Sequence, residues 1–152
     1  GTIGEANRMD ATVISDAVNL ASRLEGLTKI YGAPILISDA TFQRIKNQDD
    51  YQYRMLGRVQ VKGKKDSVGI LEIIHDPSPD IAEFKSKSKP MFERGIFFYL
   101  QKDFEAAANI FKTVAQANPD DKAASLFQIR CEYYLKHGTP EAWDGVEVFE
   151  VK

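Results

Sequence analysis

An asparagine and an arginine four residues apart are the first side chains in this sequence that could do chemistry together. Asn19 and Arg23 fall on one predicted helix, and residues at this spacing share a helix face. An arginine offers a planar fork of donors that matches phosphate oxygens, and an asparagine amide both donates and accepts hydrogen bonds. The pair therefore suits a polyphosphate or a ribose, although an isolated pair of this kind is more often an ordinary polar helix face.

The elements around this pair follow from helical spacing and from breaker residues. The sequence predicts a short strand over residues 11–14 and a helix from Ser15 or Asp16 to about Tyr31, where Gly32 stops it. Leucines at positions 20, 24 and 27 recur at helical spacing and predict its buried stripe. The Asn and Arg side chains therefore face outward, or into a cleft with a second surface.

The wider run over residues 8–25 reads Arg-Met-Asp-Ala-Thr-Val-Ile-Ser-Asp-Ala-Val-Asn-Leu-Ala-Ser-Arg-Leu-Glu. It resembles the signature of the class III adenylate/guanylate cyclases, in which a strand and a turn lead to a helix that opens on Val-Asn-x-Ala-x-Arg. Segments at 35–38, 56–57 and 61–64 follow in the family's order, so the resemblance covers about residues 1–75. Two positions depart from it, because the family often has an aromatic residue at Ala11 and a glycine at Ser15.

The resemblance implies a reaction in which a nucleoside triphosphate is cyclised and pyrophosphate leaves. It implies that Asn19 orients the ribose and that Arg23 stabilises charge on the transferring phosphoryl group. It places Thr12 at the base-selecting position and implies adenine, hence ATP and cyclic AMP, although a hydroxyl alone does not enforce that choice. Lys62 matches a lysine that reaches the triphosphate, and its alternative is a solvated hairpin tip.

The family's metal site is missing from the sequence. The resemblance implies two Mg²⁺ or Mn²⁺ ions held by two aspartates of the domain's first half, and no segment here resembles that half. We therefore expect no metal ion to be bound by this chain, since Asp49 and Asp50 fall in a polar loop. His75 and His137 have no metal-ligand spacing around them either.

Active sites of the family form between two subunits, and this has consequences for the chain. We expect a homodimer in which this segment supplies one side of the site, and no turnover by the segment alone. An incomplete sheet also exposes an edge strand and predicts self-association. The alternative function is a degenerate, non-catalytic cyclase homologue that senses nucleotide or binds a protein partner.

The rest of the chain predicts an α+β fold. A strand at 34–37, a helix at 39–45 capped by Ser38, and a hairpin of strands 53–61 and 67–74 turning at Gly63 complete the first part. We expect the second half of a ferredoxin-like cyclase catalytic domain at 1–76, a linker with solvated lysines at 77–90, and a tetratricopeptide-like helical tail at 91–152. The tail's helices are predicted at 91–100, 104–116 and 122–136, with Asp103 capping the second and Asp120 or Asp121 capping the third. Residues 146–151 are expected to form a short strand or a docking segment.

Five residues of the tail suggest the repeat. Their small, aromatic, small, aromatic and proline order resembles a tetratricopeptide helix pair: Gly95, Phe98, Ala107, Phe111 and Pro119. Such a unit needs neighbours for stability. The tail should pack on the cyclase part, on another copy or on a protein partner, and the simplest alternative is a helical extension that covers the sheet.

Composition bounds the remaining classes. With 20 basic and 22 acidic residues the charge balance gives no reason to expect the basic face that nucleic-acid binding needs, so no nucleic-acid partner is expected. One cysteine forms no internal disulfide, and no apolar run approaches the roughly 18 residues of a membrane span. The chain opens on Gly1, which we interpret as a piece of a longer protein. We expect a cytoplasmic segment, and membrane attachment of the parent through another region stays open.

Overall fold

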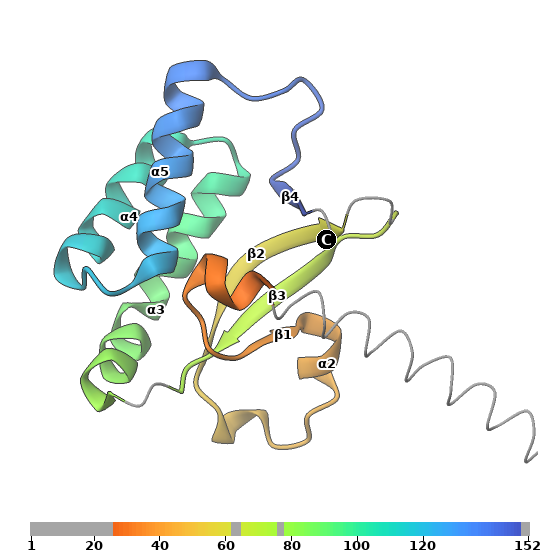
Figure 1. Cartoon of the computed structure of the whole chain (residues 1–152), viewed down its shortest axis with the longest axis vertical. Helices are drawn as coiled ribbons and strands as arrows, with labels where there is room; N and C mark the ends of the chain where they lie inside the picture. Colours follow the sequence, from red (N-terminus) through yellow and green to blue (C-terminus); the bar gives the residue numbers. More distant parts are fainter. Residues whose placement is uncertain (1–25, 62–64, 76–77, 150–152) are drawn as a thin grey trace, which may run out of the picture.

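The computed structural model describes residues 26–61, 65–75 and 78–149. They form a four-stranded sheet with a bundle of three helices beside it (Figure 1). The strands are β1 (Leu36–Ser38), β2 (Tyr53–Val61), β3 (Val68–Ile73) and β4 (Val146–Phe149), in the order β1-β3-β2-β4. The strand predicted at 11–14 lies outside the described residues.

The predicted hairpin strands are confirmed. β2 and β3 pair antiparallel, with Tyr53 opposite Ile73 and Val59 opposite Val68. The C-terminal strand is also present and lies parallel to β2, with Arg58 opposite Val146. The end of the chain therefore returns to the sheet and covers the edge that β2 would otherwise present.

Local capping explains the short elements near β1. Helix α2 (Asp39–Gln43) begins after Ser38, whose hydroxyl accepts a hydrogen bond from the Thr41 amide at 3.1 Å, as predicted. Residues 26–31 are helical, and the chain leaves this helix at Gly32, where φ is +63°. That left-handed conformation favours glycine and confirms the predicted stop.

Side chains alternate along each strand, so each strand contributes residues to both faces of the sheet. Both faces are buried, each in its own core. Leu56 and Ile70 belong to the large core beneath the long helices. Leu71 and Ile73 point the other way and pack in a smaller core with Phe42 of α2. The helical tail therefore takes one face of the sheet, and α2 takes the other.

The three long helices are α3 (Pro79–Leu100), α4 (Phe104–Ala117) and α5 (Lys122–His137), while η1 (Gln48–Asp50) is a short 3-10 turn. Asp103 and Asp121 cap α4 and α5 by accepting from the amides of Ala106 and Ala124. The cap of α4 is the predicted one, and the cap of α5 is the second of its two candidates, Asp120 and Asp121. Gly138, with φ +74°, ends α5. In the part of the chain that the structure describes, no helix has both the length and the apolarity needed to cross a membrane.

The expected linker at 77–90 differs from the structure. Residues 79–90 form the first half of α3, with Pro79 in the first turn, where its missing N–H costs nothing. The lysines are not all solvated either, because Lys85 is buried and ion-paired with Glu72. The ion pair with Glu72 holds this polar segment against the sheet, and the local sequence around Lys85 gives no sign of that partner.

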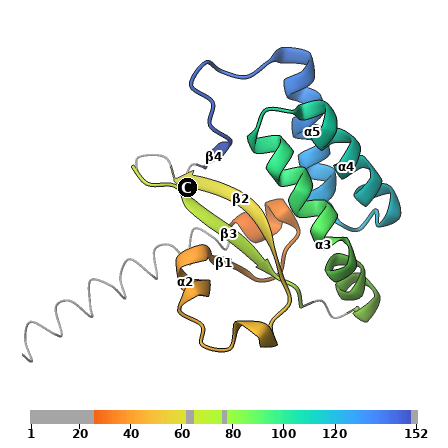
Figure 2. The same ribbon diagram turned by 180° about the vertical axis from the view of Figure 1, so that it is seen from behind.

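The tail packs on the sheet within the same chain. One hydrophobic core joins Tyr31 and Leu56 of the first part to Phe92 and Phe111 of the tail. Figure 2 shows the helices from behind, along the face formed by β2 and β3. Gly95 lets α3 and α4 approach, since an added Cβ would lie 2.8 Å from the Phe111 ring. The α+β class is confirmed, while the ferredoxin-like and tetratricopeptide-like assignments remain predictions.

Candidate functional site

The four residues predicted to contact substrate lie outside the described residues. They are Thr12, Asn19, Arg23 and Lys62. The structure therefore does not show whether they come together. It does show two elements next to them in sequence, namely the helical residues 26–31 and the strands on either side of residues 62–64.

The helical end that follows Arg23 in sequence is firmly held. Leu27 and Tyr31 are buried in the large core. Beyond the helix, the amide of Ala33 donates to the carbonyl of Thr28 at 3.0 Å and closes the last turn. This end of the helix is therefore a fixed part of the fold.

The base of the hairpin is held by Arg58 of β2. Its guanidinium donates to the Ser67 hydroxyl at 3.0 Å and to the Ser67 carbonyl at 2.9 Å. A 3.6 Å ion pair to Asp39 adds little, since both side chains are partly exposed. These bonds connect the two ends of the segment that contains Lys62.

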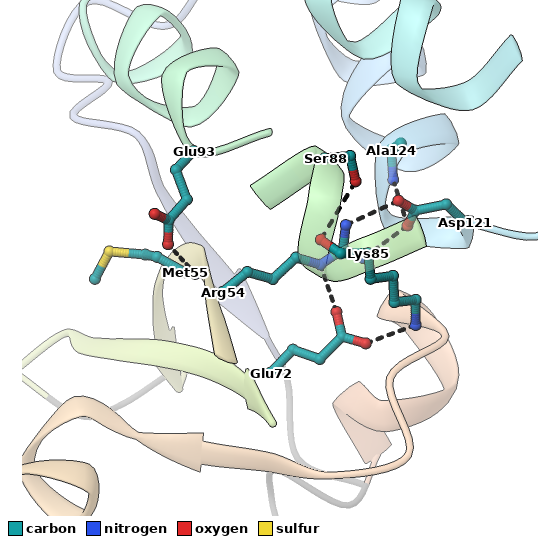
Figure 3. Close-up of polar contacts among 8 residues, drawn as sticks. All are labelled: Arg54, Met55, Glu72, Lys85, Ser88, Glu93, Asp121 and Ala124. Atoms are coloured by element: carbon teal, nitrogen blue, oxygen red, sulfur yellow. Dashed lines mark hydrogen bonds and ion pairs between the residues drawn. The ribbon is translucent and has the colours of Figure 1, made fainter. Parts of the chain in front are cut away.

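Between the sheet and the helices of the tail, four buried charged side chains form what we call the ionic centre: Arg54, Glu72, Lys85 and Asp121. They converge from β2, β3, α3 and the start of α5 (Figure 3). Arg54 donates to both oxygens of Asp121 at 2.8 and 2.7 Å and to Glu72 at 2.6 Å. Lys85 donates to the second oxygen of Glu72 at 2.7 Å. The centre thus ties the sheet to two helices of the tail.

Two cations and two anions balance in the ionic centre, which makes their burial tolerable. Burial lowers the pKa of Arg54, but hydrogen bonds and charges from Asp121 and Glu72 outweigh it, so the net pKa is raised. The guanidinium also lies 4.1 Å from the centre of the Phe92 ring. Removal of one member would leave an uncompensated buried charge. The arrangement is suited to holding elements together.

A second polar group, the tyrosine cluster, consists of Tyr31, Tyr99, Arg130 and Glu147. The Tyr99 hydroxyl donates to Glu147 at 2.7 Å, and Arg130 donates to the Tyr31 hydroxyl at 3.3 Å. Arg130 and Glu147 also form a 3.9 Å ion pair. Burial raises the pKa of both tyrosines above the ordinary value, so both stay protonated near neutral pH. This cluster joins the helical end at Tyr31 to α3, α5 and β4.

Metal and nucleophile chemistry find little support in the described ranges. No group of three or more His, Cys, Asp or Glu side chains there could hold a metal ion. Asp49 and Asp50 are exposed in η1, and Asp50 accepts from the Asn47 amide at 2.8 Å. Burial raises the pKa of the Cys131 thiol to about 12, which keeps it protonated and unreactive.

Sequence reasoning missed the ionic centre and the tyrosine cluster. One signal was available, because Arg54 and Glu72 are opposite charges within two apolar strands. They face each other across the β2–β3 ladder, so a correct hairpin register would have paired them. Lys85 and Asp121 gave no such signal, since no strand register links either residue to its partner.

Three curated proteins are similar to this chain. A protein named "Adenylate cyclase, terminal-differentiation specific" from Dictyostelium discoideum is 36% identical over 137 residues, which is 90% of this chain and 6% of that protein. Proteins named "Adenylate cyclase" from Anabaena cylindrica and "Adenylate cyclase 1" from Rhizobium meliloti (strain 1021) are 45% and 38% identical over 74 residues. These two matches cover 48% and 49% of this chain, and 15% and 11% of the relatives.

The extent of these matches shows which part of the chain resembles the relatives. No family model matches the chain, and no solved structure matches it. The 137-residue match is longer than the 76 residues expected for the cyclase part, so it reaches into the helical tail. The chain spans only a small part of each relative. It is therefore similar to a segment of proteins named adenylate cyclase, and this similarity supports an adenylate cyclase-related function.

Proposed function

We propose that this chain is the second half of an adenylate cyclase catalytic domain, which converts ATP to 3′,5′-cyclic AMP and pyrophosphate. The observation that carries the proposal is the 36% identity over 137 residues to the Dictyostelium protein named adenylate cyclase. The signature run at residues 8–25 supports it, because an asparagine and an arginine carry the hydrogen-bond donors that suit a ribose and a phosphoryl group.

Four residues of this chain have roles in the proposed reaction. Asn19 orients the ribose, and Arg23 stabilises the charge that develops on the transferring phosphoryl group. Thr12 hydrogen-bonds the adenine, and Lys62 contacts the triphosphate. The buried end of the helix at Leu27 and Tyr31 supports this proposal, because transition-state stabilisation requires rigid positioning.

The metal ions belong to the other side of the proposed site. Two Mg²⁺ or Mn²⁺ ions, when bound, activate the ribose 3′-hydroxyl and neutralise the triphosphate. The described residues offer no cluster that fits such ions, so we assign their ligands to the first half of the domain. A homodimer then completes each site with residues from both subunits. We place the site in the cytoplasm, and the tail offers a surface for a protein partner.

The test measures cyclic AMP formation by the natural chain that contains this sequence together with the preceding half of the domain, here called the completed domain. We expect Arg23→Ala to lower kcat by about a hundredfold or more, as removal of a transition-state donor does. The matched control is Lys87→Ala on exposed α3 surface, which should keep wild-type turnover. A completed domain without activity, or an Arg23→Ala variant near wild type, would show that the proposal is wrong.

A further inference from the structure

Helix α5 of the tail contacts residues 26–31, the helical segment that follows the proposed catalytic residues in sequence. Lys122 donates from Nζ to the Lys29 carbonyl, and Arg130 donates from Nη1 to the Tyr31 hydroxyl at 3.3 Å. The Phe127 ring lies 6.1 Å from the Tyr31 ring, measured between centroids. Three side chains of one tail helix therefore hold the last turn of residues 26–31.

The contact also fixes the chain just beyond this helix. The Lys122 side chain lies so close to Gly32 that an added Cβ there would be 2.6 Å from the Lys122 Cβ. Because Gly32 has a positive φ, only a glycine combines that backbone with this approach. The glycine that ends the helix therefore also allows α5 to approach.

Helix α5 is itself anchored to the sheet. Directly before its first residue, the capping Asp121 binds Arg54 of β2 through two hydrogen bonds of 2.8 and 2.7 Å. One turn beyond Phe127, Arg130 pairs with Glu147 of β4 at 3.9 Å. Helix α5 therefore connects the sheet to residues 29–31, which follow Arg23 in sequence.

We propose that Lys122 and Arg130 are positioning residues for the cyclase reaction, acting through residues 26–31, the described end of the helix that the sequence predicts to carry Asn19 and Arg23. The inference rests on the proposed function. Arg23 precedes the first described helical residue, Gly26, by only three positions, so on the predicted helix a tilt of residues 26–31 would also move position 23. Displacements of about 1 Å can cost roughly a hundredfold in rate. The tail is then a part of the catalytic apparatus.

The test is a double-mutant cycle in the completed domain. Arg130→Gln should lower kcat by roughly ten- to a hundredfold while the KM for ATP changes by less than about threefold. Tyr31→Phe keeps the ring and removes the accepting oxygen, so it should lower kcat in the same direction. The double variant should lose little more than Arg130→Gln alone, because both changes remove one interaction. Arg130→Lys, which keeps a donor, should recover part of the loss.

A stability control separates positioning from general damage. Phe42→Leu weakens the smaller core on the other face of the sheet, which includes none of the three α5 side chains that contact residues 29–32. It should lower the melting temperature as much as Arg130→Gln does and leave kcat close to wild type. The inference is wrong if both variants lower kcat equally, or if Arg130→Gln and Tyr31→Phe keep wild-type kcat. If the wild type makes no cyclic AMP, or Arg23→Ala retains its rate, the proposed function fails as well.

Discussion

At the scale of single residues, burial determines which charged side chains are costly to remove. The ionic centre places Arg54, Glu72, Lys85 and Asp121 in the interior, and each anion there has at least one cationic partner. Pairs of this kind contribute little against a well-packed apolar replacement, but they make removal of one partner costly. The centre therefore specifies how the tail sits on the sheet.

Two lysines on α3 offer a matched comparison. Lys85→Met should lower the free energy of unfolding by about 3 kcal/mol, because Glu72 loses one of its two cationic partners in the interior. Lys87 is 76% exposed and pairs with Glu83 on the surface, so Lys87→Met should cost less than about 0.5 kcal/mol. Urea denaturation of both variants measures the difference. Equal costs would mean that Lys85 is solvated in solution.

The buried thiol predicts a pH dependence. Burial raises the pKa of Cys131 from 9.0 to about 12, so the folded protein keeps a proton that the unfolded chain releases. Its contribution to stability is complete below pH 9 and falls as the pH rises, by up to about 1.4 kcal/mol per pH unit. Cys131→Ala should flatten this fall in urea titrations between about pH 9 and about pH 11. An unchanged slope would contradict the assigned burial.

At the scale of elements, close approach of α3 and α4 depends on a glycine. Gly95→Ala would bring a Cβ to 2.8 Å from the Phe111 ring and 3.1 Å from Ile110. Both neighbours lie in a packed interface, so we expect a loss of about 1–3 kcal/mol in the free energy of unfolding. Gly26 is the matched control, because it is helical and an added Cβ there meets nothing within 4 Å.

The control has its own expected sign. Gly26→Ala should raise the stability by about 0.5–1 kcal/mol through helix propensity alone. Calorimetric melting of both variants, compared with wild type, gives the two shifts. If both variants were stabilised, the α3–α4 interface would be looser than the structure shows.

Local patterns predicted most elements, and long-range charges explain what was missed. Ser38 and Asp103 could be predicted as caps, and Asp121 as one of two candidates, because capping depends on residues nearby in sequence. The 77–90 segment was misjudged because its lysines read as solvated, whereas Lys85 finds Glu72 in another element. The predicted site residues remain predictions, since they lie outside the described residues. The contacts of α5 to Tyr31 could not be predicted from spacing, because they join residues far apart in the chain.

At the scale of the whole molecule, the two parts share one core. Tyr31 and Leu56 of the first part lie in the same cluster as Phe92 and Phe127 of the tail. Such a shared core favours a single cooperative unit. We therefore expect amides of β2 and of α4 to exchange hydrogen with the same free energy of opening. Helices that stay protected after the strands have exchanged would show two independent units.

The central claim is that this chain belongs to an enzyme that makes cyclic AMP. The most direct measurement is the product analysis of the completed domain with ATP and with GTP, in the presence of Mg²⁺ or Mn²⁺. The account predicts cyclic AMP and pyrophosphate in equal amounts from ATP, and a lower yield from GTP, given the threonine at position 12. If a folded domain formed no cyclic nucleotide from ATP or from GTP with either metal ion, the claim would be wrong.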